Sequence, residues 1–180
     1  MDKRQELLRQ AITTVPNYPK PGVQFRDITS LLEQPEALAE AAAGLVEAFA
    51  GANVNKIVAI EARGFIFGSI LAHQLGLGLV LARKPGKLPR ATHSQAYCLE
   101  YGEDTLHIHS GALSCGDRVL LIDDLIATGG TAQAVVRLVK TMGAVVTHAG
   151  FVVALPELGG VEQLKQAGVK TVYLLEYKGQ

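Results

Sequence analysis

The chain has 180 residues, which fits one domain of ordinary size. Hydrophobic residues make up 48% and charged residues 19% of it, a composition that excludes an intrinsically disordered protein. Lys plus Arg and Asp plus Glu number 17 each, so the formal net charge is zero. This balance argues against a general nucleic-acid binder or a binder of anionic membranes, since both normally carry a basic excess.

The N-terminal residues and the cysteines bear on where the protein works. Residues 1–10 are charged and amphipathic and do not resemble a secretory signal. The apolar runs are well short of the ~18 residues that a membrane span needs. Cys98 and Cys115 match no metal-binding spacing. A disulfide between them is open on counting alone, but two thiols in such a chain are more often reduced. We therefore expect a soluble cytoplasmic protein.

The N-terminal part of the chain predicts two helices around an irregular connection. Residues 3–12 carry apolar side chains on one face, as in a short amphipathic helix. Prolines and a glycine within residues 17–22 predict a stiffened turn. A second helix is expected to begin at Pro35 and to end near Gly51, because its apolar residues follow helical spacing.

After residue 56 the pattern changes to buried strands that alternate with helices. Short, continuous apolar runs predict strands at residues 57–60, 78–82, 118–122, 144–153 and 171–175. Helical spacing predicts helices at residues 64–75, 130–141 and 161–167. This order indicates one α/β domain spanning residues 1–180, with a doubly wound, mostly parallel sheet flanked by helices.

Residues 84–110 do not fit this alternation. They hold glycine, proline and polar residues, with only weak alternation over residues 106–109. A long polar segment inside a compact domain is usually disordered or functional, often as a lid. We therefore expect a loop here.

The most informative segment runs from Arg118 to Thr131. It combines a buried strand, the adjacent carboxylates Asp123 and Asp124, and a loop of small residues before a helix. Ligands of open α/β sheets bind beyond the carboxyl ends of the strands. The loop N–H groups and the positive end of the helix can hold an anion. We therefore predict a monophosphate cradle formed by Ala127, Thr128, Gly129, Gly130 and Thr131.

This cradle differs from the commoner phosphate loops, because the chain contains neither GxxxxGK followed by Ser or Thr nor GxGxxG at this position. Asp123 and Asp124 are acceptors when ionised. A phosphate beside two carboxylates suits a ribose 5-phosphate, whose vicinal hydroxyls the carboxylates would bind. The alternative is a buried strand that ends in an ordinary polar turn.

The segment resembles the motif with which type I phosphoribosyltransferases bind 5-phosphoribosyl 1-pyrophosphate (PRPP). Other segments resemble the adenine-specific members of that family, and they are residues 18–29, 61–65, 83–89 and 99–102. The resemblance runs in order from about residue 3 to the last strand. It implies the type I phosphoribosyltransferase fold, in which residues 1–33 form a small N-terminal hood that binds the base and residues 84–110 form a flexible catalytic loop.

The resemblance also implies a reaction. N9 of adenine displaces pyrophosphate from C1 of PRPP, giving AMP in purine salvage through an oxocarbenium-like transition state. The leaving pyrophosphate needs cations. By resemblance, the catalytic Arg63 and three further residues supply them: Arg83, Lys84 and Lys87. Mg²⁺ is the implied cofactor and is carried by PRPP, with no ligand directly from the protein. The family is commonly dimeric, so a homodimer is expected, without a nucleic-acid or membrane partner.

The base is implied to bind at the N-terminal signature. The backbone of Gln24 and Arg26 would read adenine while Phe25 stacks on its ring. Family members often carry an aliphatic residue where Gln24 stands, and recognition through the backbone tolerates that departure. Glu100 matches a catalytic glutamate that handles protons on the base, and Tyr101 matches a tyrosine that helps to close the loop.

Other interpretations of the same residues stay open. Phe25 also fits core packing, and the cations of residues 83–90 also fit a solvated loop. A close relative would use a 6-oxopurine or orotate, and residues 18–29 are the feature that argues for adenine. The same fold serves as a PRPP-sensing domain in transcription regulators, although the residues before the first core strand show no basic recognition helix. His107 and His109 share a strand face, as a metal pair or as solvated residues.

Overall fold

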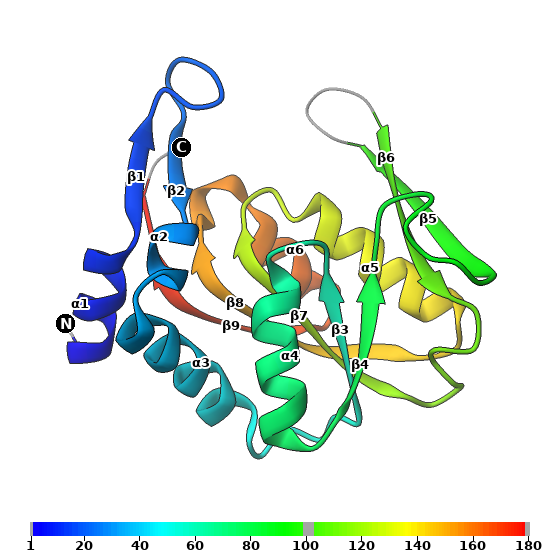
Figure 1. Cartoon of the computed structure of the whole chain (residues 1–180). Coiled ribbons are helices and arrows are strands. Elements are labelled where there is room, and N and C mark those ends of the chain that lie inside the picture. The colour runs from blue at the N-terminus through cyan, green and yellow to red at the C-terminus, as the bar shows by residue number, and fades with distance from the viewer. Residues whose placement is uncertain (1, 99–102, 179–180) are drawn as a thin grey trace.

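A computed structural model describes residues 2–98 and 103–178. Its centre is a five-stranded sheet with the order β4-β3-β7-β8-β9, and every neighbouring pair is parallel (Figure 1). The strands are β3 (Lys56–Ile60), β4 (Gly78–Ala82), β7 (Arg118–Ile126), β8 (Val145–Ala154) and β9 (Lys170–Glu176). The predicted doubly wound parallel sheet is therefore confirmed.

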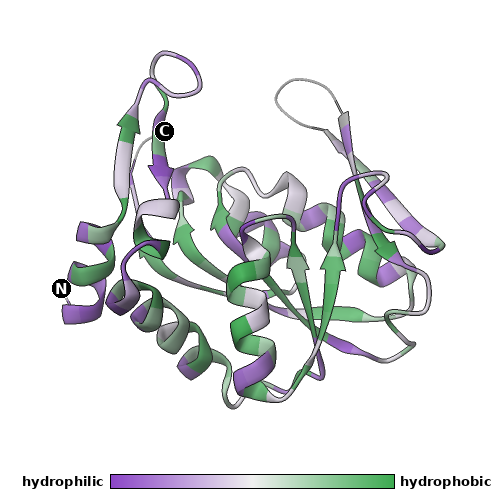
Figure 2. Cartoon of the chain, viewed as in Figure 1, coloured by the Kyte–Doolittle hydropathy of each residue, from purple (hydrophilic) through white to green (hydrophobic). Residues whose placement is uncertain are grey.

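Helices cover both faces of this sheet. Consecutive residues of the central strands point to opposite faces, and both sets are apolar. Ile57 and Leu120 pack with α3 (Pro35–Phe49) and α4 (Gly64–Leu75) in one buried cluster. On the opposite face, Val58 and Leu121 belong to the cluster that contains α5 (Gly130–Thr141) and part of α6 (Gly160–Gln166). Figure 2 shows these central strands as mostly hydrophobic. No helix in the described ranges has both the length and the apolar character that crossing a membrane requires.

The N-terminal hood consists of α1 (Lys3–Ala11), β1 (Thr13–Pro16), β2 (Gln24–Asp27) and α2 (Thr29–Leu32). The expected turn lies between β1 and β2, which pair antiparallel with Val15 opposite Phe25. The sequence analysis did not predict these two strands, because each has four residues and lacks an apolar run. In Figure 1 this ribbon stands on one side of the carboxyl ends of the central strands.

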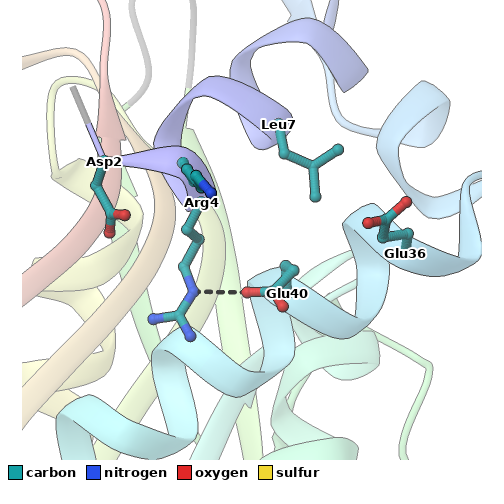
Figure 3. Close-up of a pocket in the computed structure, with 6 residues that line it drawn as sticks. Asp2, Arg4, Leu7, Glu36 and Glu40 are labelled. Carbon is teal, nitrogen blue, oxygen red and sulfur yellow. Dashed lines mark hydrogen bonds and ion pairs between the residues drawn. The ribbon is translucent and has the colours of Figure 1, made fainter.

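Helix α1 contacts helix α3 through ion pairs and also buries its Leu8 side chain in the core. A pocket between α1 and α3 contains the Arg4 guanidinium, whose Nε lies 2.9 Å from Glu40 Oε2 (Figure 3). Arg4 Nη1 also lies 2.8 Å from Glu47 Oε2. These ion pairs, together with the buried Leu8, hold the hood against α3.

Residues 84–98 and 103–110 contain regular secondary structure that the sequence analysis did not predict. They contain the antiparallel hairpin of β5 (Thr92–Cys98) and β6 (Glu103–His109), which stands opposite the hood in Figure 1. Leu106 and Ile108 are buried in the cluster that includes α5. The two strands were not predicted because the inward positions of β5 are mostly polar and show no apolar alternation. That this segment acts as a flexible catalytic loop stays a prediction.

The other elements lie close to their predicted positions. The helices expected at residues 64–75 and 130–141 have those bounds in the structure. Strand β7 is longer than expected and continues to Ile126 rather than stopping near residue 122. Asp123 and Asp124 therefore lie within a hydrogen-bonded strand, which fixes their backbone more firmly than a turn would.

The packing of α4 on β3 depends on Gly68. A Cβ atom at Gly68 would lie 2.6 Å from the Cβ of Ala59. We expect Gly68→Ala to lower the free energy of unfolding by about 1–3 kcal/mol, the usual cost of overpacking a core. Urea denaturation measures the change. Gly51→Ala is the matched control, since a Cβ there meets nothing within 4 Å. Equal stability of the two variants would contradict the close contact.

Candidate active site

A cavity of about 210 Å³ lies where β7 leads into α5. It brings together the predicted phosphate cradle and one of the two predicted ribose-binding carboxylates. Its lining residues are Asp123, Leu125, Ile126, Ala127, Thr128, Gly129, Gly130, Thr131, Ala132 and Phe151. The residues proposed for the 5-phosphate thus share one concave surface, whereas their ligand stays a prediction.

Close backbone contacts determine the shape of the cradle. Gly129 has a φ of 82°, and a Cβ there would lie 2.7 Å from the Cα of Gly160. The Gly160 N–H donates to the Ala127 carbonyl at 3.0 Å. Helix α5 starts at Gly130, and no side chain caps its N-terminus. Its first-turn N–H groups and its dipole therefore remain available for an anion.

The two carboxylates have different surroundings. Asp124 is buried, and its Oδ2 accepts a hydrogen bond from Arg63 Nε at 2.5 Å. The Asp123 Oδ1 atom accepts from the Asp124 N–H at 2.9 Å. A Cβ at Gly64 would lie 2.9 Å from this same Asp123 oxygen. The glycine at the start of α4 thus allows the segment after β3 to approach the carboxyl end of β7.

This arrangement shifts the pKa values of the charged groups. Burial of the carboxyl group raises the pKa of Asp123 well above its ordinary value, and the neighbouring Asp124 charge raises it further. Burial lowers the pKa of Arg63, but the Asp124 carboxylate outweighs this effect and the net shift is upward. The site thus holds the Arg63–Asp124 ion pair beside the Asp123 carboxyl group, whose raised pKa disfavours its ionised form.

The other predicted pyrophosphate-binding cations also meet carboxylates. Arg83 Nε lies 3.0 Å from Glu61 Oε2, and Lys84 Nζ lies 3.2 Å from Asp104 Oδ2. Arg63 and Arg83 follow the adjacent parallel strands β3 and β4, so they emerge at the same edge of the sheet. Lys87 is exposed.

The hairpin also contacts the cradle through a residue that the sequence analysis missed. Tyr97 lies in the buried cluster that includes Ala132 and Val135 of α5, and its hydroxyl donates to Asp104 Oδ2 at 3.3 Å. Burial raises the pKa of Tyr97. No sequence signal marks Tyr97, Asp104 or Glu61, because each is a single polar residue whose partner lies on another element.

A second cavity, of about 200 Å³, separates the hood from the end of β7. Its lining includes the three residues predicted to bind the base and the catalytic arginine: Lys20, Val23, Gln24, Phe25, Arg26, Arg63, Leu125, Ala127, Leu155 and Leu158. Leu125 and Ala127 line both cavities, so the two adjoin. The sequence analysis missed the leucine walls, which come from separate segments that only the fold brings together.

Strand β2 presents the predicted base-binding groups in a regular way. Backbone N–H and C=O groups of alternate residues point to the same edge of a strand, so Gln24 and Arg26 share an edge. Phe25 is partly buried, and the Tyr18 ring packs edge-to-face on it with 5.1 Å between ring centroids. The hood therefore offers one aromatic ring and one hydrogen-bonding edge to the second cavity.

Two predicted residues lie outside the part of the chain that the structure describes, and these are Glu100 and Tyr101. Within the described ranges, no group of three His, Cys, Asp or Glu side chains is arranged to hold a metal ion. The Nδ1 atoms of His107 and His109 lie 3.0 Å from Thr92 Oγ1 and Arg90 Nη2, respectively.

Comparison with known proteins agrees with this geometry. A family model described as phosphoribosyl transferase domain matches residues 27–172, which include the sheet strands from β3 to β8 and the cradle. Fold and site together therefore define the class as phosphoribosyltransferases.

Individual relatives narrow the class. A Shewanella loihica protein named adenine phosphoribosyltransferase is 52% identical over 174 residues, covering 97% of this chain and 96% of that protein. The adenine phosphoribosyltransferase structure from Thermoanaerobacter pseudethanolicus matches with a TM-score of 0.91 and 42% identity, covering 96% of this chain and 99% of that one. The Saccharomyces cerevisiae enzyme, complexed with adenine and an imino-altritol bisphosphate, matches with a TM-score of 0.88 and 35% identity, covering 97% and 100%. The chain belongs to the adenine phosphoribosyltransferase family.

The raised pKa of Asp123 predicts a pH-dependent stability. The native state keeps its proton longer than the unfolded state, so stability falls as pH rises from the ordinary value of 3.8 through the native pKa. We expect Asp123→Asn to remove this fall and to have the higher Tm at neutral pH. Each kcal/mol regained is worth roughly 2–4 °C in a chain of this size.

Thermal unfolding of the ligand-free protein between about pH 4 and pH 8 measures the effect. Asp104→Asn is the matched control with the opposite sign, since the Thr105 N–H and Lys84 lower the pKa of Asp104. Its Tm should fall relative to the wild type at neutral pH. A lower Tm for Asp123→Asn at every pH would contradict the assigned shift.

Proposed function

We propose that the protein transfers the 5-phosphoribosyl group of PRPP to N9 of adenine and releases AMP and pyrophosphate. The observation that carries the proposal is the adjoining pair of cavities. One contains the phosphate cradle, the other contains Phe25 and the β2 edge, and Leu125 and Ala127 line both. A base in the second cavity therefore lies next to a ribose 5-phosphate held in the first.

The proposed PRPP site divides the substrate charge among separate groups. The 5-phosphate binds at the N-terminus of α5 and accepts hydrogen bonds from the hydroxyl groups of Thr128 and Thr131. The ribose hydroxyls bind the carboxyl groups of Asp123 and Asp124, whose oxygens accept hydrogen bonds in either protonation state. Binding then requires that ligand oxygens and hydroxyls replace the internal pairing of Arg63 with Asp124.

Arg63 is positioned for the leaving group. It lines the base cavity and also bonds to Asp124 at the ribose end, so it lies at the junction where C1 of the ribose is expected. As the C1–O bond breaks, negative charge grows on the pyrophosphate, and the guanidinium stabilises it there. Arg83, Lys84 and Lys87 supply further positive charge from the segment after β4.

The chemistry of the site fits Mg²⁺ as a companion of PRPP. The described residues offer no three-ligand metal cluster, and Asp124 is already paired with Arg63. A hard ion that keeps several waters and takes its other oxygens from the substrate needs few protein ligands. When bound, the ion would neutralise charge on the pyrophosphate. Glu100 is proposed to handle protons on the base, and Tyr101 to help close the hairpin over it.

A base-specificity assay tests the proposal. Purified protein is incubated with PRPP, Mg²⁺ and each of adenine, hypoxanthine, guanine and orotate, and the products are separated. We expect AMP to form fastest, because the backbone edge of Gln24 and Arg26 suits the adjacent donor and acceptor of adenine. Tight PRPP binding without turnover of any base would instead favour a PRPP sensor. Faster formation of IMP or GMP would overturn the choice of base.

Phe25→Ala tests the base cavity separately. Loss of a stacking ring costs about 1–3 kcal/mol per base, so the KM for adenine should rise roughly tenfold or more. The KM for PRPP should stay near its original value, because Phe25 does not line the phosphate cavity. Equal increases for both substrates would assign Phe25 to packing.

We also propose a homodimer and a cytoplasmic location. Apolar side chains line a groove between α3 and α4, and these are Pro35, Leu38, Ala39, Ala42, Ala43, Val46 and Ile70. A second copy of the chain that covers this groove would remove that surface from water. The thiol of Cys115 is free and exposed, which suits a reducing compartment.

Light scattering after size-exclusion chromatography tests the dimer. The wild type should elute with twice the mass of one chain, and Ala39→Arg should elute with the mass of one. Ala167→Arg is the matched control, because Ala167 is exposed beside α6 on the opposite face of the sheet. A wild-type protein with the mass of a single chain would contradict the dimer.

A further inference from the structure

Tyr177 forms a stacked cluster that the proposed chemistry does not use. It directly follows β9, and two guanidinium groups lie over its ring. The Cζ of Arg9 is 4.7 Å from the ring centroid, and the Cζ of Arg26 is 4.4 Å from it. These residues come from α1, β2 and the end of β9, so the cluster joins three separate segments.

The cluster is held in place from the sheet side. The Tyr177 N–H donates to the Ala154 carbonyl at 3.0 Å, which anchors it to the end of β8. Arg9 Nη2 donates to the Glu176 carbonyl at 3.0 Å, and Arg26 Nη1 donates to Thr14 Oγ1 on β1. Figure 1 shows β9 running up beside the hood. Tyr177 is thus a rigid part of the sheet layer against which the hood rests.

The ring, and not the hydroxyl, makes these contacts. Within the described part of the chain, the buried Tyr177 hydroxyl has no hydrogen-bond partner. The Nε atoms of Arg9 and Arg26 are also buried without one. Besides the one hydrogen bond already named for each guanidinium, the contact of both groups with Tyr177 is cation–π stacking, which strengthens when the groups are removed from water.

The hood needs such an anchor because its two strands form an isolated ribbon. Two-stranded hairpins are marginally stable by themselves and require packing against another surface. Arg26 and Phe25 are neighbours on β2, so their side chains leave opposite faces of the strand. Fixing the Arg26 side chain on Tyr177 therefore sets the orientation in which Phe25 faces the base cavity.

We propose that Tyr177 is a positioning residue for adenine, which holds β2 so that Phe25 and the backbone edge of Gln24 and Arg26 face the base. This inference rests on the proposed function. Tyr177 is not among the residues that line the base cavity and acts through Arg26. The sequence offers no signal for this role, because Arg9 and Arg26 lie near the N-terminus and Tyr177 follows more than 150 positions later.

The test compares Tyr177→Leu and Tyr177→Phe in the full chain. Tyr177→Leu should raise the KM for adenine by roughly tenfold, the size expected from losing two cation–π contacts, with the KM for PRPP near its original value. Hydrogen exchange of the ligand-free protein should show faster exchange in residues 13–27. Tyr177→Phe should match the wild type in both measurements, because the hydroxyl has no partner in the described structure.

Tyr173→Leu is the matched control on the same strand. Tyr173 packs with the cluster on the opposite face of the sheet from the one that contains Tyr177. Its substitution should leave the KM for adenine and the exchange of residues 13–27 unchanged. A Tyr177→Leu variant with unchanged exchange in residues 13–27, or with equal increases in both KM values, would overturn the inference. A wild-type protein that makes no AMP would instead overturn the proposed function, and the exchange measurement would still test the anchor.

Discussion

The ion pair between Arg63 and Asp124 joins the segment after β3 to the end of β7, and the proposed site is arranged around it. The pair is only partly shielded, since the Arg63 side chain is 45% exposed and that of Asp124 is 7% exposed. Burying a carboxylate without a partner is costly, and the guanidinium offsets that cost in the ligand-free protein. The approach is close enough that Gly64 is needed beside Asp123.

The same constraint explains how a neutral chain can receive a strongly anionic substrate. Arg63, Arg83 and Lys84 each contact a carboxylate, which offsets the repulsion between these cations. Substrate oxygens would replace those carboxylates as partners. The cradle adds no charge of its own, because its backbone and the α5 dipole provide the attraction for the phosphate. The balanced count of acidic and basic residues is therefore consistent with a polarised site.

The sequence predicts features that one contiguous segment forms, but not features that depend on contacts between distant segments. The parallel strands β3 and β7 are continuous apolar runs, and the cradle is one contiguous segment, so both were predictable. The β1–β2 ribbon and the β5–β6 hairpin were not, because their strands are short or polar and owe their stability to tertiary contacts. The same holds within the site. Leu155 and Leu158 complete the base cavity, yet nothing in their neighbourhood along the chain distinguishes them from core residues.

The stack of Arg9, Tyr177 and Arg26 also links the site to the order in which the chain is made. The hood leaves the ribosome first, whereas Tyr177 leaves only after all five sheet strands. Segments that fold as they emerge can assemble the β3–β8 layer and the cradle while the hood still lacks its anchor. On the proposed role of Tyr177, the half of the site that would recognise the base is completed after the half that would hold the phosphate.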